Sequence, residues 1–118
     1  MTQEKRQLLL ADLCARLPYG LIVTNQLVDN GHICKLNPYS LRIGYFIDSS
    51  RIDETKMFLR PLYSITEEEK EYLEELSEFK CTPDKATKKI DFYLSHHIDY
   101  RGLIPMGLAL EAPEGMYY

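Results

Sequence analysis

The stretch that decides the fold is TEEEKEYLEELSEF, residues 66–79. Thr66 and Glu69 have the spacing of a capping box, in which each side chain binds the backbone N–H of the other residue. The apolar residues that follow recur at the three- and four-residue intervals of a helix, at Tyr72, Leu73, Leu76 and Phe79. This pattern predicts an amphipathic helix with one buried stripe.

A second helix is predicted immediately downstream of the first. Thr82 and Pro83 are typical of a helix start, because threonine caps free N–H groups and proline suits the first turn. Helically spaced apolar residues then continue towards His97. We therefore expect this helix to end near Ser95 or His97.

The N-terminal third of the chain predicts a helix followed by a β-hairpin. Residues 2–17 carry leucines spaced for one buried face, Thr2 can cap the first turn, and Gly20 lies just past the end. Residues 21–28 and 33–36 are β-favouring runs separated by DNGH, in which Asn and Gly supply the positive φ of a tight turn.

Further strands are predicted in the middle of the chain and near its end. Apolar residues alternate with others over residues 41–47, which indicates a strand with one buried face. Residues 56–59 fit a fourth strand, which Pro61 ends or places at a sheet edge. Beyond the last helix we expect turns, with at most one short helix or strand around residues 108–112.

These elements together predict the fold class and the domain organisation. The 118 residues can bury one hydrophobic core but are too few for two domains of ordinary size. Residues 1–118 are therefore expected to form a single globular domain. We predict an α+β fold, with a small antiparallel β-meander of three or four strands packed with about three α-helices.

The charge of the chain is concentrated in one segment. The formal net charge is −4, from 18 Asp or Glu against 14 Lys or Arg. Residues 67–78 hold seven Glu and one Lys, which leaves 13 Lys or Arg against 11 Asp or Glu elsewhere. The acidity is thus expected on one helix face. Because nucleic-acid binding needs a clustered excess of cations, a nucleic-acid partner is not expected.

The apolar runs and the cysteines bear on location and cofactors. No apolar run approaches the ~20 residues that span a bilayer, and none resembles the core of a signal peptide. We therefore expect a cytoplasmic protein without membrane association. Cys14, Cys34 and Cys81 form no CxxC pair, so they are expected to be reduced, and no cofactor is predicted.

Three segments carry a resemblance to a known group of proteins. They are LRPLYSITEEE at residues 59–69, HHIDYRGLI at residues 96–104 and GLALEAPEGMY at residues 107–117. Together they resemble small uncharacterised proteins encoded by gut Bacteroidetes and their prophage-like elements. The resemblance implies a phage or mobile-element setting. It carries over no catalytic or binding residue, because that group has no assigned activity.

The densest group of chemically active side chains is Asp91, His96, His97, Asp99, Tyr100 and Arg101, of which His96, His97, Asp99 and Arg101 are the candidate ligand or metal residues. Imidazoles beside carboxylates could bind a metal or form a general base oriented by an acid. Neighbouring helical residues point about 100° apart, however, and His97 falls on the apolar stripe, which favours a hydrogen-bonded core histidine. Asp99 and Arg101 could form a recognition loop for an anionic group. The alternative is that Asp99 caps a turn and Arg101 pairs with a local acid.

Two functional hypotheses follow from the sequence. It has no GxSxG, Walker A, GxGxxG or HExxH motif, so we favour a non-enzymatic interaction or accessory protein, with a phage-derived origin left open. The candidate interaction residues are Glu67, Glu71, Glu74, Glu78, Tyr117 and Tyr118. The alternative is a metal-dependent hydrolase or nuclease centred on His96 and Asp99. The expected partner is another protein, and homo-oligomerisation is left open.

Overall fold

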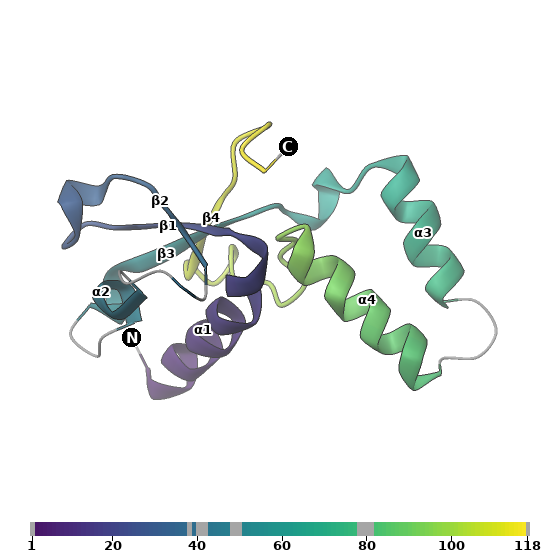
Figure 1. The fold of residues 1–118 in the computed structure, drawn as a ribbon, viewed down its shortest axis with the longest axis horizontal. Coiled ribbons are helices and arrows are strands. Elements are labelled where there is room, and N and C mark those ends of the chain that lie inside the picture. The colour runs from purple at the N-terminus through teal and green to yellow at the C-terminus, as the bar shows by residue number, and fades with distance from the viewer. Residues whose placement is uncertain (1, 38, 40–42, 48–50, 78–81, 118) are drawn as a thin grey trace.

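The computed structural model describes residues 2–37, 39, 43–47, 51–77 and 82–117, and its ribbon is shown in Figure 1. The helices and strands are, in chain order, α1 (Gln3–Arg16), β1 (Leu21–Asn25), β2 (Cys34–Leu36), α2 (Ile43–Ile47), β3 (Thr55–Leu59), α3 (Glu67–Ser77), α4 (Pro83–Ser95) and β4 (Ala109–Glu111). Short 3-10 turns are η1 (Leu17–Tyr19), η2 (Asp29–Gly31), η3 (Ile52–Glu54) and η4 (Leu62–Ser64). The predicted α+β fold is confirmed.

The sheet is mixed, which corrects the expected antiparallel meander. Its strand order is β2-β1-β3-β4, with β1 antiparallel to both β2 and β3. β4 instead pairs in parallel with β3, and Met57 lies opposite Ala109. A parallel pair needs a long crossover, which α3 and α4 supply here. Near residues 108–112, where we expected at most one short helix or strand, the structure has the short strand β4, and it lies parallel to its neighbour.

The predicted β-hairpin between β1 and β2 is confirmed. Leu21 lies opposite Leu36, and Asn30 and Gly31 in the turn have φ values of 58° and 83°. Asparagine and glycine tolerate this left-handed region better than other residues do. Thr24 on β1 donates its hydroxyl hydrogen bond to the Gly31 carbonyl at 2.6 Å, which fixes the turn against the strand.

The strand predicted over residues 41–47 is wrong where the structure describes it. Ile43–Ile47 form the short helix α2, and residues 41 and 42 lie outside the described residues. Phe46, which a strand would place on the less buried face, is 1% exposed. Ile43 and Ile47 pack beside it against the core. Ile43 and Ile47 are four residues apart, and positions at this spacing share a face in a strand and in a helix. The positions of these two residues therefore could not distinguish the two structures.

The hydrophobic core lies between α1 and one face of the sheet. Leu9 and Leu13 of α1, Val23 of β1 and Met57 of β3 have no exposed surface. In Figure 1, α1 and α2 lie on one side of the sheet, whereas the C-terminal segment rises on the other. The predicted Thr2 cap of α1 is confirmed, because its side chain accepts a hydrogen bond from the Lys5 N–H at 3.2 Å.

Helices α3 and α4 form a hairpin that projects from this body, and we call it the α3–α4 arm (Figure 1). Its extension makes the molecule 47 Å long and 29 Å in the other two directions. The predicted capping box is confirmed: Glu69 N–H donates to Thr66 Oγ1 at 3.2 Å, and Thr66 N–H donates to Glu69 Oε1 at 2.9 Å. At α4 the cap is one-sided: Thr82 Oγ1 accepts from the Lys85 N–H at 3.3 Å. No helix in the described parts of the chain has the length and apolarity needed to cross a bilayer.

Candidate functional site

The end of α4 separates the two neighbouring histidines of the predicted cluster. His96 lies on the outer side, where its Nδ1 is 3.0 Å from the Phe92 carbonyl and its ring stacks on Phe92 with a 4.1 Å centroid separation. At His97 the chain turns through a left-handed conformation, with φ at 55°. This turn directs the following residues towards β3, where Asp99 N–H donates to the Arg60 carbonyl.

The prediction of a hydrogen-bonded core histidine at His97 is confirmed. The residue is 2% exposed, and its Nε2 lies 2.9 Å from the Tyr19 carbonyl oxygen. Because a carbonyl can only accept, Nε2 carries the proton and donates. Burial lowers the pKa of His97 to about 4, so the ring is neutral at pH 7. Its ring stacks on Tyr117 with centroids 4.2 Å apart.

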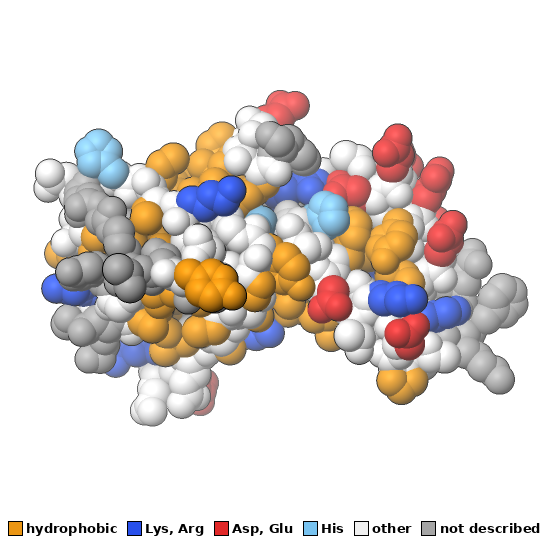
Figure 2. Space-filling view, viewed as in Figure 1, with side chains coloured by type: hydrophobic (Ala, Val, Ile, Leu, Met, Phe, Trp, Pro, Cys, Tyr) orange, Lys and Arg blue, Asp and Glu red, His pale blue; other side chains and the backbone are white. Residues whose placement is uncertain are grey.

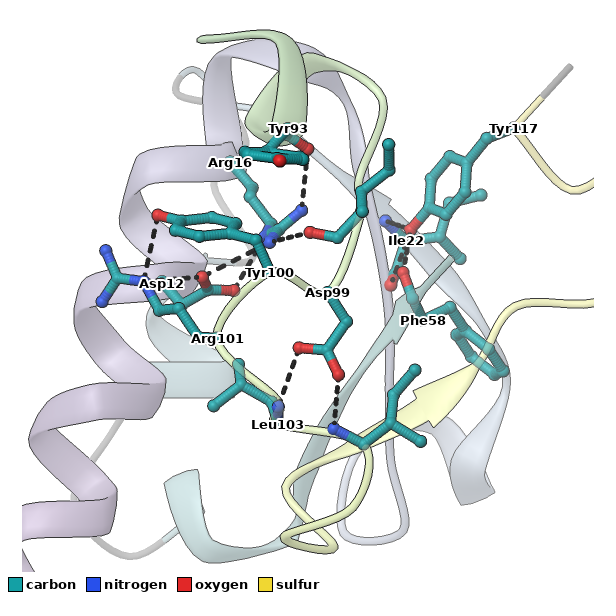
Figure 3. A network of polar contacts seen from close by, with 12 residues as sticks. Asp12, Arg16, Ile22, Phe58, Tyr93, Asp99, Tyr100, Arg101, Leu103 and Tyr117 are labelled. Atoms are coloured by element: carbon teal, nitrogen blue, oxygen red, sulfur yellow. Dashed lines mark hydrogen bonds and ion pairs between the residues drawn. The ribbon is translucent and has the colours of Figure 1, made fainter. Parts of the chain in front are cut away.

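Asp99 has the turn-capping role that the sequence analysis gave as the alternative to recognition. Its carboxylate accepts hydrogen bonds from the N–H groups of Leu103 at 2.7 Å and Ile104 at 2.9 Å, as Figure 3 shows for this network. The residue is 4% exposed. Across the described residues there is no group of three or more His, Cys, Asp or Glu side chains that could hold a metal ion. The metal-centred alternative therefore has no ligand set in the described structure.

Arg101 does pair with an acid, but the acid is not local in the sequence. Its Nε lies 3.3 Å from Asp12 Oδ1 on α1, and it also donates to the Tyr100 hydroxyl at 3.0 Å (Figure 3). Asp12 in turn forms an ion pair of 2.7 Å with Arg16, and neither side chain of that pair has exposed surface. Arg101 is therefore part of an internal charge network.

Arg16 extends this network to the end of the arm. Its Nη2 donates to the Ile98 carbonyl at 2.6 Å, and its Nη1 lies 3.4 Å from the Tyr93 carbonyl. We call Asp12, Arg16 and Arg101, with the carbonyls of Tyr93 and Ile98, the arm joint. Sequence reasoning missed Asp12 and Arg16. Their spacing could have identified them, because Asp12 and Arg16 are four residues apart and share the buried face of α1 with Leu9 and Leu13.

A hollow opens where the arm meets the body. It measures about 450 Å³ and is lined by Tyr19, Tyr72, Lys88, Asp91, Phe92, Ser95 and His96. Tyr72 on α3 packs against Phe92 on α4 with centroids 5.2 Å apart. Tyr19 and Tyr72 retain 41% and 40% of their surface exposed. We call this hollow the aromatic groove.

The predicted acidic face lies on α3 beside this groove. Glu67, Glu71 and Glu74 are exposed there, and Glu78 lies outside the described residues. Figure 2 shows acidic side chains gathered over this part of the molecule. Glu69 differs from them, because it binds Arg60 at 2.7 Å. That hydrogen bond lowers the pKa of Glu69 to about 2.

Tyr117, which we expected to be available to a partner, is instead used within the fold. Its hydroxyl donates to the Phe58 carbonyl at 2.6 Å and accepts from the Ile22 N–H at 3.0 Å (Figure 3). The hydroxyl thus bridges β1 and β3 next to their last paired residues, Val23 and Met57. Burial raises the pKa of Tyr117 to about 12. Tyr118 lies outside the described residues.

Protein-family models, curated proteins and solved structures all gave no match. A functional proposal for this chain therefore rests on its own geometry.

Proposed function

We propose that the protein is a non-enzymatic interaction protein whose α3–α4 arm binds a basic segment of another protein. The observation that carries the proposal is the position of the aromatic groove beside an exposed acidic helix face. Tyr72 contributes to the groove, and Glu68 and Glu75 lie four residues before it and three after it on α3. Residues at these spacings share a helix face, so an aromatic ring lies between two exposed carboxylates.

The charges of the groove favour a cationic ligand. Asp91 lines the groove, and the other charged lining residue, Lys88, is 3.2 Å from Asp84, which partly offsets its charge. The exposed faces of Tyr19 and Tyr72 can receive a lysine or arginine side chain, at about 0.5–1 kcal/mol for each exposed cation–π contact. Neighbouring carboxylates strengthen the attraction at low ionic strength.

The composition of α3 supports the same proposal. Glu71 lies four residues from both Glu67 and Glu75, and like charges at this spacing cost a helix about 0.2–0.5 kcal/mol for each pair. A basic segment docked on this face would reduce that repulsion. Binding of the segment would therefore also stabilise the arm.

Selection from a random-peptide display library on the immobilised protein tests the proposal. We expect the enriched peptides to be rich in Lys and Arg, and to bind less tightly at high salt. Tyr72→Ala should weaken the selected peptides about tenfold or more, as truncation of a central aromatic anchor does. Tyr39→Ala is the matched control, because Tyr39 is 91% exposed and does not line the groove.

Two results would contradict this function. One is enrichment of peptides without basic residues. The other is equal binding of the selected peptides by the Tyr72→Ala protein, since that would place the contact outside the groove.

A further inference from the structure

A second hollow lies at the C-terminal ends of the parallel strands β3 and β4, away from the aromatic groove. After Leu59 and Glu111 the two strands separate. Residues from the segments 60–66 and 111–114 line a space of about 560 Å³ between them. A smaller apolar slot of about 240 Å³ adjoins it, and Leu62, Ile104 and Pro105 are among the residues that line it. Pro61, Tyr63 and Glu111 border both spaces, so the two form one continuous site. We call this the strand-end site.

Large apolar side chains are exposed at the strand-end site. Tyr63 is 78% exposed and Leu62 is 53% exposed. Met106 and Leu110, close to it in the chain, are also large apolar residues with much of their surface exposed. Clusters of exposed apolar side chains mark interaction surfaces more often than isolated ones do.

The backbone of β4 offers a second means of recognition. β4 is an outer strand, paired with β3 alone among the described strands. Ala112 N–H donates to the Leu59 carbonyl at 2.8 Å, and successive residues of a strand direct their backbone groups to opposite sides. The N–H and C=O groups of Glu111 and Ala109 therefore point away from β3, but Ala109 is only 4% exposed, so the accessible part of this edge is at Glu111. An extended peptide could pair with the backbone of Glu111 as the start of an added strand.

The fixed charges of the strand-end site select the chemistry of that peptide. Glu111 and Glu114 line the larger space, and Asp99 borders the slot. Arg60 is the one cation among the described lining residues, and both of its terminal nitrogens bind the Glu69 carboxylate, at 2.7 and 3.0 Å. The Tyr63 hydroxyl contacts one oxygen of Glu111, which leaves the other oxygen to accept from a ligand. The site thus presents excess negative charge beside an apolar slot.

We propose that the strand-end site binds an extended segment of a partner protein that carries an apolar side chain next to a lysine or arginine. The segment pairs with the outer edge of β4, the apolar side chain enters the slot, and the cation contacts Glu111 and Glu114. This contact is separate from the aromatic groove of the arm, and either contact can exist without the other.

The test is a titration of the ¹⁵N-labelled protein with two pools of capped extended peptides, followed by amide chemical shifts. The pools share a fixed apolar residue and differ at one position, which is Lys in one pool and Glu in the other. We expect the Lys pool to shift the amides of Ala109, Glu111 and residues 62–64. Glu111→Gln should weaken that binding about two- to fivefold, as expected for a partly exposed ion pair. Glu54→Gln, an exposed glutamate outside the site, is the matched control.

Each of the other outcomes overturns the proposal. Equal shifts with both pools would show that the Glu111 and Glu114 carboxylates do not select a cation. Shifts confined to α3 and α4 would show that the peptides bind the arm instead. An absence of shifts with both pools would show that the strand-end site does not bind such peptides. Leu62→Ala is a second test variant in case Glu111→Gln does not fold. It shortens a side chain that lines the slot and is already exposed.

Discussion

The sheet body and the α3–α4 arm bury their side chains in different ways. In the body, Leu13, Val23 and Met57 have no exposed surface, and α1 and α2 both pack against the core on one side of the sheet. Among the described residues of the arm, Leu73 and Leu94 are the buried apolar side chains, and each retains 8% exposure. The difference indicates that the body supplies most of the cooperative stability, whereas the arm supplies exposed surface.

The arm joint connects these two regions through polar groups. Arg16 on α1 reaches the carbonyls of Tyr93 and Ile98 at the end of α4, and Asp12 neutralises its charge. A hydrogen bond depends on direction, so such a joint fixes the orientation of the arm more strictly than apolar contact would. The joint is therefore the first place at which to separate the stability of the body from that of the arm.

The largest effect is expected from Arg16→Met. This change leaves the Asp12 carboxylate fully buried without its main partner and removes the donors to Tyr93 and Ile98. The free energy of unfolding should fall by about 3–5 kcal/mol, measured by urea denaturation. The double change Asp12→Leu with Arg16→Met should recover much of the loss, because no fully buried charge remains unpaired; Arg101 loses Asp12 but is partly exposed to water. A loss below about 1 kcal/mol in the single variant would show that the network contributes little to stability.

A comparable effect is expected from acid through His97. Its pKa is about 4 in the folded protein and returns to about 6.5 on unfolding, so the unfolded chain binds more protons between these pH values. Stability is therefore full above about pH 6.5 and falls as the pH is lowered towards 4, by about 3 kcal/mol in total. Urea denaturation across this range measures the loss. His97→Gln should flatten it, and an unchanged profile in that variant would assign the loss to other groups.

A smaller loss is expected from Tyr117→Phe. The change keeps the ring that stacks on His97 and removes the hydroxyl that joins Ile22 to Phe58. A buried backbone group left without its partner costs about 1–3 kcal/mol, and hydrogen exchange at the Ile22 amide should accelerate. Tyr39→Phe, at an exposed position, is the control and should change neither quantity. If Ile22 keeps its protection, the bridge between β1 and β3 does not depend on the hydroxyl.

Local chemistry explains which parts of the fold could be predicted from the sequence. Three helix caps, at Thr2, Thr66 and Thr82, are local. Each threonine side chain accepts from the N–H of the residue three positions later, so sequence spacing alone identifies the caps. The turn at Asn30 and Gly31 is local in the same sense. The strand prediction fails at Ile43–Ile47 for a different reason. The segment fits both the two-residue period of a strand and the 3.6-residue period of a helix, and burial of Phe46 against the core favours the helix.

The candidate site depended on contacts between distant segments, which the sequence does not display. The core position of His97 can be predicted because the apolar stripe of α4 leads up to it, although the helix ends at Ser95; the Tyr19 carbonyl then supplies the hydrogen-bond partner that a buried imidazole needs. The partner of Arg101, by contrast, is on α1, and the groups that Tyr117 bridges are on two strands. Neither contact follows from spacing, so the sequence offers Tyr117 as an interaction residue and leaves Arg101 open between a recognition loop and a local ion pair, whereas both side chains are used within the fold.

The smallest effect is expected on the arm, where charge rather than packing dominates. Glu71→Gln removes the repulsion of Glu71 with both Glu67 and Glu75 while keeping a side chain of similar helix propensity. The amides of α3 should gain about 0.5 kcal/mol of protection against hydrogen exchange, and those of β1 should be unchanged. High salt should abolish the gain, because exposed charges are then screened. An equal gain in β1 would instead mean that the arm and the body unfold as one unit, so that the contrast between them is one of surface and not of stability.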